Sequence, residues 1–255
     1  MKQTPLVDVN VSCGHWPFVR LPARDLPALD SLLEKSGIKQ ALVSPLEAVF
    51  LPDPDVCNRE LFDSILPYQR LLAVPTINLA MPDFLENLDY YRQRAGLKAV
   101  KLYPNFHNYS LRSRRLEKLV AYLETNDIRL IINVRLVDER HQYFGLKIKG
   151  LATRQIADFG YKYPSIQFLC TGLYLPEIEE LAPVCPNFST DMSFADWHDL
   201  IPRLLESLPA DRLFFGSHTP LMVTEANAAK LRMADIPEST RRQIGRENAE
   251  RFFCL

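Results

Sequence analysis

The chain has 255 residues, of which 47% are hydrophobic, and its 30 basic and 31 acidic side chains leave a formal net charge of −1. A chain of this length and composition buries a large core. Its scattered charges exclude both the basic stripe of a nucleic-acid-binding protein and the charge block of a disordered tail.

The cysteines and the N-terminal residues indicate where the protein resides. The five cysteines form no CxxC pair, which is typical of reduced thiols in a cytosolic protein. The first five residues lead into a strand without the hydrophobic core of a signal peptide. No apolar stretch approaches the roughly 20 residues that a membrane-spanning helix needs. We therefore expect a soluble cytoplasmic protein.

Apolar, β-branched runs alternate with amphipathic helical patterns along the whole chain. The strands are predicted at residues 6–12, 40–45, 71–78, 99–103, 128–135, 166–171, 188–193 and 212–217. The helices are predicted at residues 26–35, 56–66, 84–94, 113–126, 151–163, 177–184, 197–208, 225–233 and 239–252. Apolar runs such as Leu130-Ile131-Ile132 suit strands that are buried on both faces, as in a parallel sheet.

Eight consecutive βα units predict an α/β fold, a (β/α)8 TIM barrel that forms a single domain over residues 1–255. The main alternative is a doubly wound open sheet, which usually carries a glycine-rich loop after its first strand. Here the segment after the first strand, Ser12-Cys13-Gly14-His15-Trp16, offers one glycine. The pattern therefore favours the barrel.

In a parallel barrel the functional site lies at the C-terminal ends of the strands. The polar side chains that the predicted strands place there are Asp8, Asn10, Ser12, Lys101, Asn105, Asn133, Arg135, Thr171, Asp191, Ser193, Ser217 and His218. This rim is polar and includes several cations.

Four segments of the chain are similar to one known family. They are residues 8–18 (Asp-Val-Asn-Val-Ser-Cys-Gly-His-Trp-Pro-Phe), 100–105 (Val-Lys-Leu-Tyr-Pro-Asn), 212–220 (Arg-Leu-Phe-Phe-Gly-Ser-His-Thr-Pro) and 247–252 (Glu-Asn-Ala-Glu-Arg-Phe). Together they make the chain resemble the amidohydrolase-related family of metal-dependent hydrolases and carboxy-lyases over nearly its whole length. The resemblance implies a TIM barrel with a divalent metal at its mouth.

The residues that the family uses to hold its metal are replaced in this chain. The family's two histidines on the first strand fall on Asn10 and Ser12, and those on strands five and six fall on Asn133 and Thr171. Its strand-eight aspartate falls on His218. Amide and hydroxyl oxygens are much weaker zinc ligands than imidazole. We therefore expect no metal ligands and no cofactor, and a divalent metal such as zinc is the less favoured alternative.

Three rim residues are candidates for catalysis. His218 is a candidate general acid or base, because its ordinary pKa lies near neutrality; the alternative is a buried imidazole that fills the space of the lost aspartate. Lys101 could serve as a base or bind a carboxylate, and the alternative is an ion pair with Asp191, Asp8 or Glu139. Asp191 is either a catalytic carboxylate or the counter-ion of Lys101.

A second group of rim residues is predicted to bind substrate: Asn10, Ser12, His107, Asn133, Arg135, Arg140 and Thr171. Arg135 and Arg140 could grip a carboxylate or phosphate. The alternative for both is a structural salt-bridge cluster with Asp138 and Glu139.

These observations favour an enzyme, a hydrolase of amidohydrolase type that acts on a small polar or carboxylated molecule without the usual catalytic zinc. One alternative is a decarboxylase or another lyase of the same superfamily. Another is a non-catalytic barrel that binds a small molecule or serves as a scaffold. The expected partner is a small-molecule substrate, with no nucleic acid and no membrane, and assembly into a homo-oligomer stays open.

Overall fold

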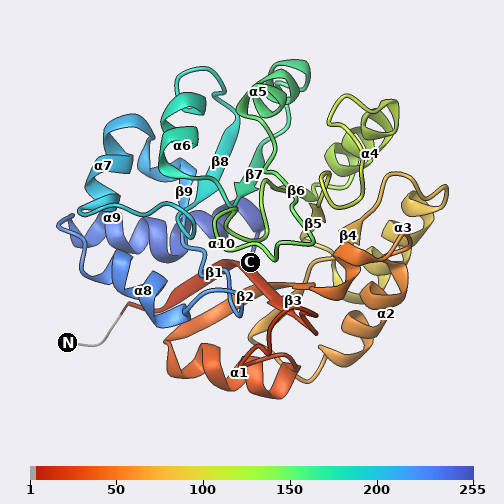
Figure 1. Ribbon diagram of the computed structural model, residues 1–255, viewed down its shortest axis with the longest axis horizontal. Helices are drawn as coiled ribbons and strands as arrows, with labels where there is room; N and C mark the ends of the chain where they lie inside the picture. Colours follow the sequence, from red (N-terminus) through yellow and green to blue (C-terminus); the bar gives the residue numbers. More distant parts are fainter. Residues whose placement is uncertain (1–3) are drawn as a thin grey trace.

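Parallel strands form a ring with helices on its outside in the computed structural model, which describes residues 4–255 (Figure 1). The strands are β1 (Leu6–Cys13), β2 (Ile38–Pro45), β3 (Leu71–Ala73), β4 (Thr76–Ile77), β5 (Ala99–Leu102), β6 (Arg129–Asn133), β7 (Phe168–Thr171), β8 (Phe188–Asp191) and β9 (Leu213–Phe214). Every pairing between neighbouring strands is parallel. The fold is the predicted TIM barrel.

The ring consists of two hydrogen-bonded sheets, one of β1 to β3 and one of β4 to β9. The predicted strand 71–78 is divided into β3 and β4 at Val74-Pro75, where proline has no N–H to donate to a ladder. The Lys101 N–H still bonds to the Pro75 carbonyl at 2.9 Å. On the other side, the Val9 N–H donates to the Phe215 carbonyl at 3.1 Å, which joins β1 to the end of β9.

The helices follow the strands in the predicted order. They are α1 (Leu26–Lys35), α2 (Asp55–Ser64), α3 (Phe84–Ala95), α4 (Arg114–Thr125), α5 (Thr153–Lys162), α6 (Leu175–Leu181), α7 (Leu200–Ser207), α8 (Thr224–Arg232), α9 (Glu238–Arg242) and α10 (Asn248–Phe253), with short helical turns η1 (Glu47–Phe50), η2 (Ala210–Arg212) and η3 (Gln243–Glu247). The Asp25 side chain caps α1 by accepting the Ala28 N–H at 2.9 Å. Within residues 4–255, each helix is too short or too polar to cross a lipid bilayer.

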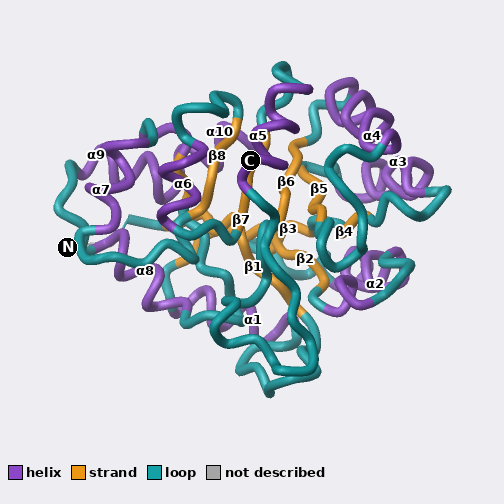
Figure 2. The backbone as a smooth tube through the Cα atoms, turned by 45° about the horizontal axis from the view of Figure 1, so that its top comes forward, coloured by secondary structure: helices purple, strands orange, loops and turns teal. Residues whose placement is uncertain are grey.

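The interior of the barrel is apolar at its lower end, where the strands begin. There α10 crosses the ring of strands (Figures 1 and 2). Its Ala249 and Phe253 belong to an apolar cluster with Val7, Val9 and Phe214. A larger apolar cluster fills the space between the strands and the outer helices. The upper, C-terminal end of the barrel is where the polar side chains gather.

Candidate functional site

Asn10 lies at the centre of a buried polar group inside the upper barrel. Its amide nitrogen donates to Asp191 Oδ2 at 2.9 Å and lies 3.1 Å from His218 Nδ1. Its amide oxygen accepts from Lys101 Nζ at 2.8 Å. Ser193 Oγ donates to the same Asp191 oxygen at 2.6 Å. We call Asn10, Lys101, Asp191, Ser193 and His218, with the neighbouring Asp8, the barrel cluster.

The barrel cluster holds two carboxyl groups and one ammonium, all out of contact with water. Asp8 and Asp191 are fully buried and Lys101 is 1% exposed. Desolvation raises the pKa of Asp8 to about 7, although N–H groups of Ser217 and Asn10 donate to its Oδ1. Desolvation likewise raises the pKa of Asp191 and lowers the pKa of Lys101 to about 8. Burial therefore favours the neutral form of each of these three side chains, and Lys101 is the one cation in the barrel cluster.

His218 follows β9 and uses both of its ring nitrogens. Nε2 lies 2.7 Å from the Leu136 carbonyl oxygen, and Nδ1 faces the Asn10 amide. Since a carbonyl only accepts, Nε2 carries the proton and Nδ1 accepts from Asn10. Desolvation lowers the pKa of His218 to about 3, so the ring is neutral at physiological pH.

The predicted catalytic residues Lys101, Asp191 and His218 therefore come together around Asn10, which was predicted to bind substrate. Two other predicted residues lie beside each other in the barrel wall, where Asn133 Nδ2 donates to Thr171 Oγ1 at 3.1 Å. Ser12 is buried as well.

The remaining predicted residues are held by other groups. Arg135 donates to both carboxylate oxygens of Glu177, at 2.5 and 2.6 Å, and lies 3.9 Å from the centre of the Tyr174 ring. Arg140 is exposed and pairs with Asp138 at 2.7 Å. His107 bonds to the Ala48 carbonyl through Nε2 at 3.0 Å. Arg140 thus pairs with the predicted Asp138, whereas the main partner of Arg135 is Glu177, which was not predicted, and Glu139 lies 3.4 Å from Arg135.

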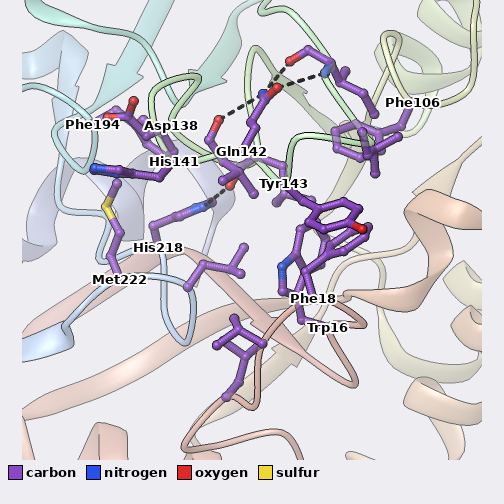
Figure 3. A pocket seen from close by; sticks show the side chains of 17 residues that line it. Trp16, Phe18, Phe106, Asp138, His141, Gln142, Tyr143, Phe194, His218 and Met222 are labelled. Carbon is purple, nitrogen blue, oxygen red and sulfur yellow. Dashed lines mark hydrogen bonds between the residues drawn. The ribbon is translucent and has the colours of Figure 1, made fainter.

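A cavity of about 530 Å³ has His218 in its wall. Figure 3 shows the side chains that line it. Its lining is mainly aromatic and aliphatic, and the polar side chains that reach it are Asp138, His141, Gln142 and His218. The residues come from the loops after β1, β5, β6, β8 and β9: Trp16, Phe18, Val19, Leu21, Phe106, Leu136, Val137, Asp138, His141, Gln142, Tyr143, Leu146, Ile148, Phe194, His218, Leu221 and Met222.

Most of these lining residues are apolar and lie in loops, whereas the sequence predicted site residues among the polar side chains at strand ends. Two signals pointed to them: the aromatic segment Trp16-Pro17-Phe18 directly after the first strand, and Tyr143-Phe144 within a polar loop. Phe18 and Tyr143 stack at 5.1 Å between ring centres, so the loops after β1 and β6 meet at the edge of the cavity. Lys101, Asp191 and Asn10 are not among the lining residues.

Residues 57–255 match the family model described as amidohydrolase, and no curated protein matches the chain. Among solved structures, the fold is similar to 5-carboxyvanillate decarboxylase from Sphingomonas paucimobilis, with a TM-score of 0.79, 12% identity, and coverage of 99% of this chain and 100% of that one. It is also similar to 2,6-dihydroxybenzoate decarboxylase in complex with 2,6-dihydroxybenzoate, with a TM-score of 0.77, 15% identity, and coverage of 99% and 100%.

A third structure corrects one expectation. Dihydroxybenzoic acid decarboxylase from Polaromonas sp. JS666 contains manganese and 2-nitroresorcinol, and its fold matches with a TM-score of 0.75, 14% identity, and coverage of 99% of this chain and 98% of that one. The expectation of no cofactor is therefore wrong: it treated the replacement of known ligands as the loss of the metal, whereas the similar structures point to a divalent metal.

The donor set of this chain does not fit such an ion by itself. Within residues 4–255, no group of three or more His, Cys, Asp or Glu side chains is arranged to hold a metal. Asn10 and Ser12 offer an amide and a hydroxyl where the family resemblance places imidazoles, and the Asn10 amide oxygen already accepts a hydrogen bond from the Lys101 ammonium at 2.8 Å.

Proposed function

Because the chain belongs to the amidohydrolase family, we propose that it is a carboxy-lyase that removes the carboxyl group of a small aromatic acid. The observation that carries the proposal is the cavity at the C-terminal mouth of the barrel, where a planar ring can pack against aromatic lining residues such as Trp16, Phe18 and Phe194. Decarboxylases of ring-hydroxylated benzoic acids that share the fold support this choice of substrate.

The chemistry suits an apolar cavity. The bond between the ring carbon and the carboxyl carbon breaks, its electron pair stays on the ring, CO2 leaves, and a proton from solvent takes its place. A carboxylate that enters this cavity loses part of its hydration, and its charge spreads as CO2 forms. Side chains such as Phe194 and Leu136 would therefore favour the transition state over the bound acid.

The same geometry supports a lyase better than a hydrolase. Hydrolysis needs a group that takes a proton from water. His218 is neutral, its Nε2 proton is bound to Leu136, and its Nδ1 is occupied by Asn10. Lys101 and Asp191 are sealed beneath the cavity. Their predicted catalytic roles thus stay predictions, to be tested by substitution.

The test is CO2 release from 2,6-dihydroxybenzoate and 5-carboxyvanillate, measured with manganese added and with a chelator. Met222→Trp places a bulky ring in the cavity, and Met233→Trp is its matched control, because Met233 is 84% exposed and lies away from the cavity. We expect Met222→Trp to lower kcat/KM by at least roughly tenfold, or about 1.4 kcal/mol, while Met233→Trp stays within about twofold. Equal rates in the two variants would place the reaction elsewhere.

A second function is supported by the sealing of the ionisable groups. With Lys101 1% exposed and Asp191 fully buried, the cavity can bind an aromatic acid without converting it. Quenching of Trp16 fluorescence by 2,6-dihydroxybenzoate, measured in a Trp197→Phe background, reports binding at the cavity. Quenching without CO2 release would favour a binding protein over a lyase.

A further inference from the structure

His218 connects the buried barrel cluster to the wall of the cavity. One ring nitrogen faces Asn10 of the cluster, and the other bonds to the main chain of Leu136. We propose that His218 is a positioning residue, which fixes the cavity wall formed by the loop after β6 instead of exchanging protons with a substrate. The structural part of this proposal stands alone, and its catalytic consequences rest on the proposed function.

The two ends of the loop after β6 are hydrogen-bonded to each other. The Leu151 N–H donates to the Val134 carbonyl at 3.1 Å, so the chain leaves and returns at the same place. We call residues 137–150 between these ends the cavity loop. Gln142 bonds to both the N–H and the carbonyl of Ile148, at 2.9 and 2.6 Å, which holds the cavity loop together internally.

The cavity loop supplies a large part of the lining, from Val137 to Ile148. Its position relative to the barrel depends on the attachments at its base. The bond from His218 Nε2 to the Leu136 carbonyl is one residue before the loop begins. Asn105 makes a second attachment, at the Lys149 carbonyl near the end of the loop. Loss of the His218 bond would leave a buried carbonyl unpaired and release one side of the base.

The surroundings of His218 hold the ring in this orientation. The residue adopts a left-handed backbone conformation, with φ +58°, which histidine and asparagine tolerate better than most side chains. The Phe194 ring packs edge-on against the imidazole, with 4.8 Å between the two ring centres. Asn10 is itself held by Asp191 and Lys101, so it presents its N–H to Nδ1 and fixes the tautomer. The imidazole therefore has one state in which every polar atom is satisfied.

Two substitutions separate positioning from proton transfer. The amide nitrogen of His218→Gln can reach the place of Nε2 and donate to Leu136, whereas His218→Asn is too short and reaches only the place of Nδ1. Asparagine also suits the left-handed backbone, so its effect does not come from main-chain strain. His198→Asn is the matched control, because His198 is exposed and lies outside the cavity.

The readout is amide hydrogen exchange of residues 136–151, which needs no substrate. We expect His218→Asn to speed exchange there by about fivefold, as for one lost hydrogen bond, and His218→Gln and His198→Asn to stay within about twofold of the native rate. Unchanged exchange in His218→Asn, or equal acceleration in His218→Gln, would overturn the proposal.

Nitrogen-15 NMR of the native protein is an independent check that requires no variant. We expect the His218 imidazole to show the neutral Nε2–H tautomer from pH 5 to 8. Titration of this signal within that range, or an Nδ1–H tautomer, would overturn the assignment.

If the protein releases CO2 from an aromatic acid, the same variants extend the test to catalysis. We expect His218→Gln to keep most of kcat, His218→Asn to raise KM, and the pH profile of kcat/KM to be the same in His218→Gln and the native enzyme. A limb of the native profile that disappears in His218→Gln would show proton transfer by His218. Absence of any turnover would count against the proposed function and leave the exchange result standing.

Discussion

Replacement of Lys101 by methionine should destabilise the fold, because it leaves two buried carboxyl groups without a nearby cation. The Lys101 ammonium is buried, donates to Asn10 Oδ1 at 2.8 Å, and is the cation that accompanies Asp8 and Asp191. Methionine has nearly the same length and fills the space, so the change removes charge with little loss of packing. What remains is a pair of buried carboxyl groups without their cation.

Removing one partner of a buried charge pair costs about 3–5 kcal/mol, against a total stability of about 5–15 kcal/mol. Lys101 bonds to the Asn10 amide and acts on the two carboxyl groups through space, so the cost of its removal should lie at the lower end of this range, near 3 kcal/mol. Burial already raises the pKa of Asp8 to about 7, so this carboxyl group is partly neutral at pH 7. Asp191 carries most of the loss, and its folded pKa rises further above the ordinary value of 3.8 when Lys101 is absent. Its stabilising contribution is then present at low pH and lost as the pH rises.

Urea unfolding followed by circular dichroism measures this difference. We expect Lys101→Met to lose about 3 kcal/mol at pH 7.5 and less at pH 5, and the double variant Lys101→Met/Asp191→Asn to recover part of the loss. Lys39→Met is the control for a surface lysine and should stay within about 0.5 kcal/mol. If Lys101→Met were as stable as Lys39→Met at pH 7.5, the barrel cluster would not depend on its cation.

Two further predictions concern the native protein and a tight turn. The pKa of Asp8 is about 7 in the folded protein against an ordinary 3.8, so its contribution to stability is complete below pH 3.8 and is lost as the pH rises to 7. The pKa of Lys101 is about 8 against an ordinary 10.5, so its contribution is complete above pH 10.5 and is lost as the pH falls to 8. Urea unfolding across pH 4–7 should therefore show a slope that flattens in Asp8→Asn, and an unchanged slope would contradict the assignment. Gly172→Ala should lower stability by about 2–3 kcal/mol in thermal unfolding, because φ is +82° and the new Cβ would press on the Arg135 carbonyl. Gly96→Ala, with φ +62° and open space around it, should cost about 1 kcal/mol, and an equal effect at both glycines would exclude the clash.

The repeated alternation of apolar strands and amphipathic helices was sufficient to predict the barrel, since each pattern reports burial along a single element. Helix α1 was predicted with its observed ends, residues 26–35. The predicted helix 239–252 is instead interrupted by η3 (Gln243–Glu247). There a Cβ on Gly245 would lie 2.9 Å from Leu6 Cδ2, a close approach between segments at opposite ends of the chain. Local periodicity contains no information about that contact.

The start of α7 differs from the prediction for a similar reason. The pattern predicts a helix from residue 197, but α7 begins at Leu200, because Asp199 takes a left-handed conformation with φ +52°. The preceding Trp197 ring packs over the Arg203 guanidinium at 4.7 Å. Amphipathic spacing cannot distinguish a first helical turn from a loop that folds back onto the helix.

The convergence of Asn10, Lys101, Asp191 and His218 was predictable, because parallel strands bring their C-terminal ends to one rim. Whether water or a ligand reaches those side chains was not. Access depends on the cavity loop, which places Tyr143 against Phe18 of another loop and leaves Lys101 sealed below.

A polar residue at a strand end therefore does not by itself indicate a catalytic residue. A side chain that faces the barrel axis is reactive only if the loops above it leave space for a substrate, and otherwise it must be satisfied by its neighbours. His218 lies at the boundary, since its ring lines the cavity while both nitrogens are bound within the protein. The polar rim therefore supports the shape of the cavity, and the loops above it, which carry the aromatic side chains, determine what the cavity can hold.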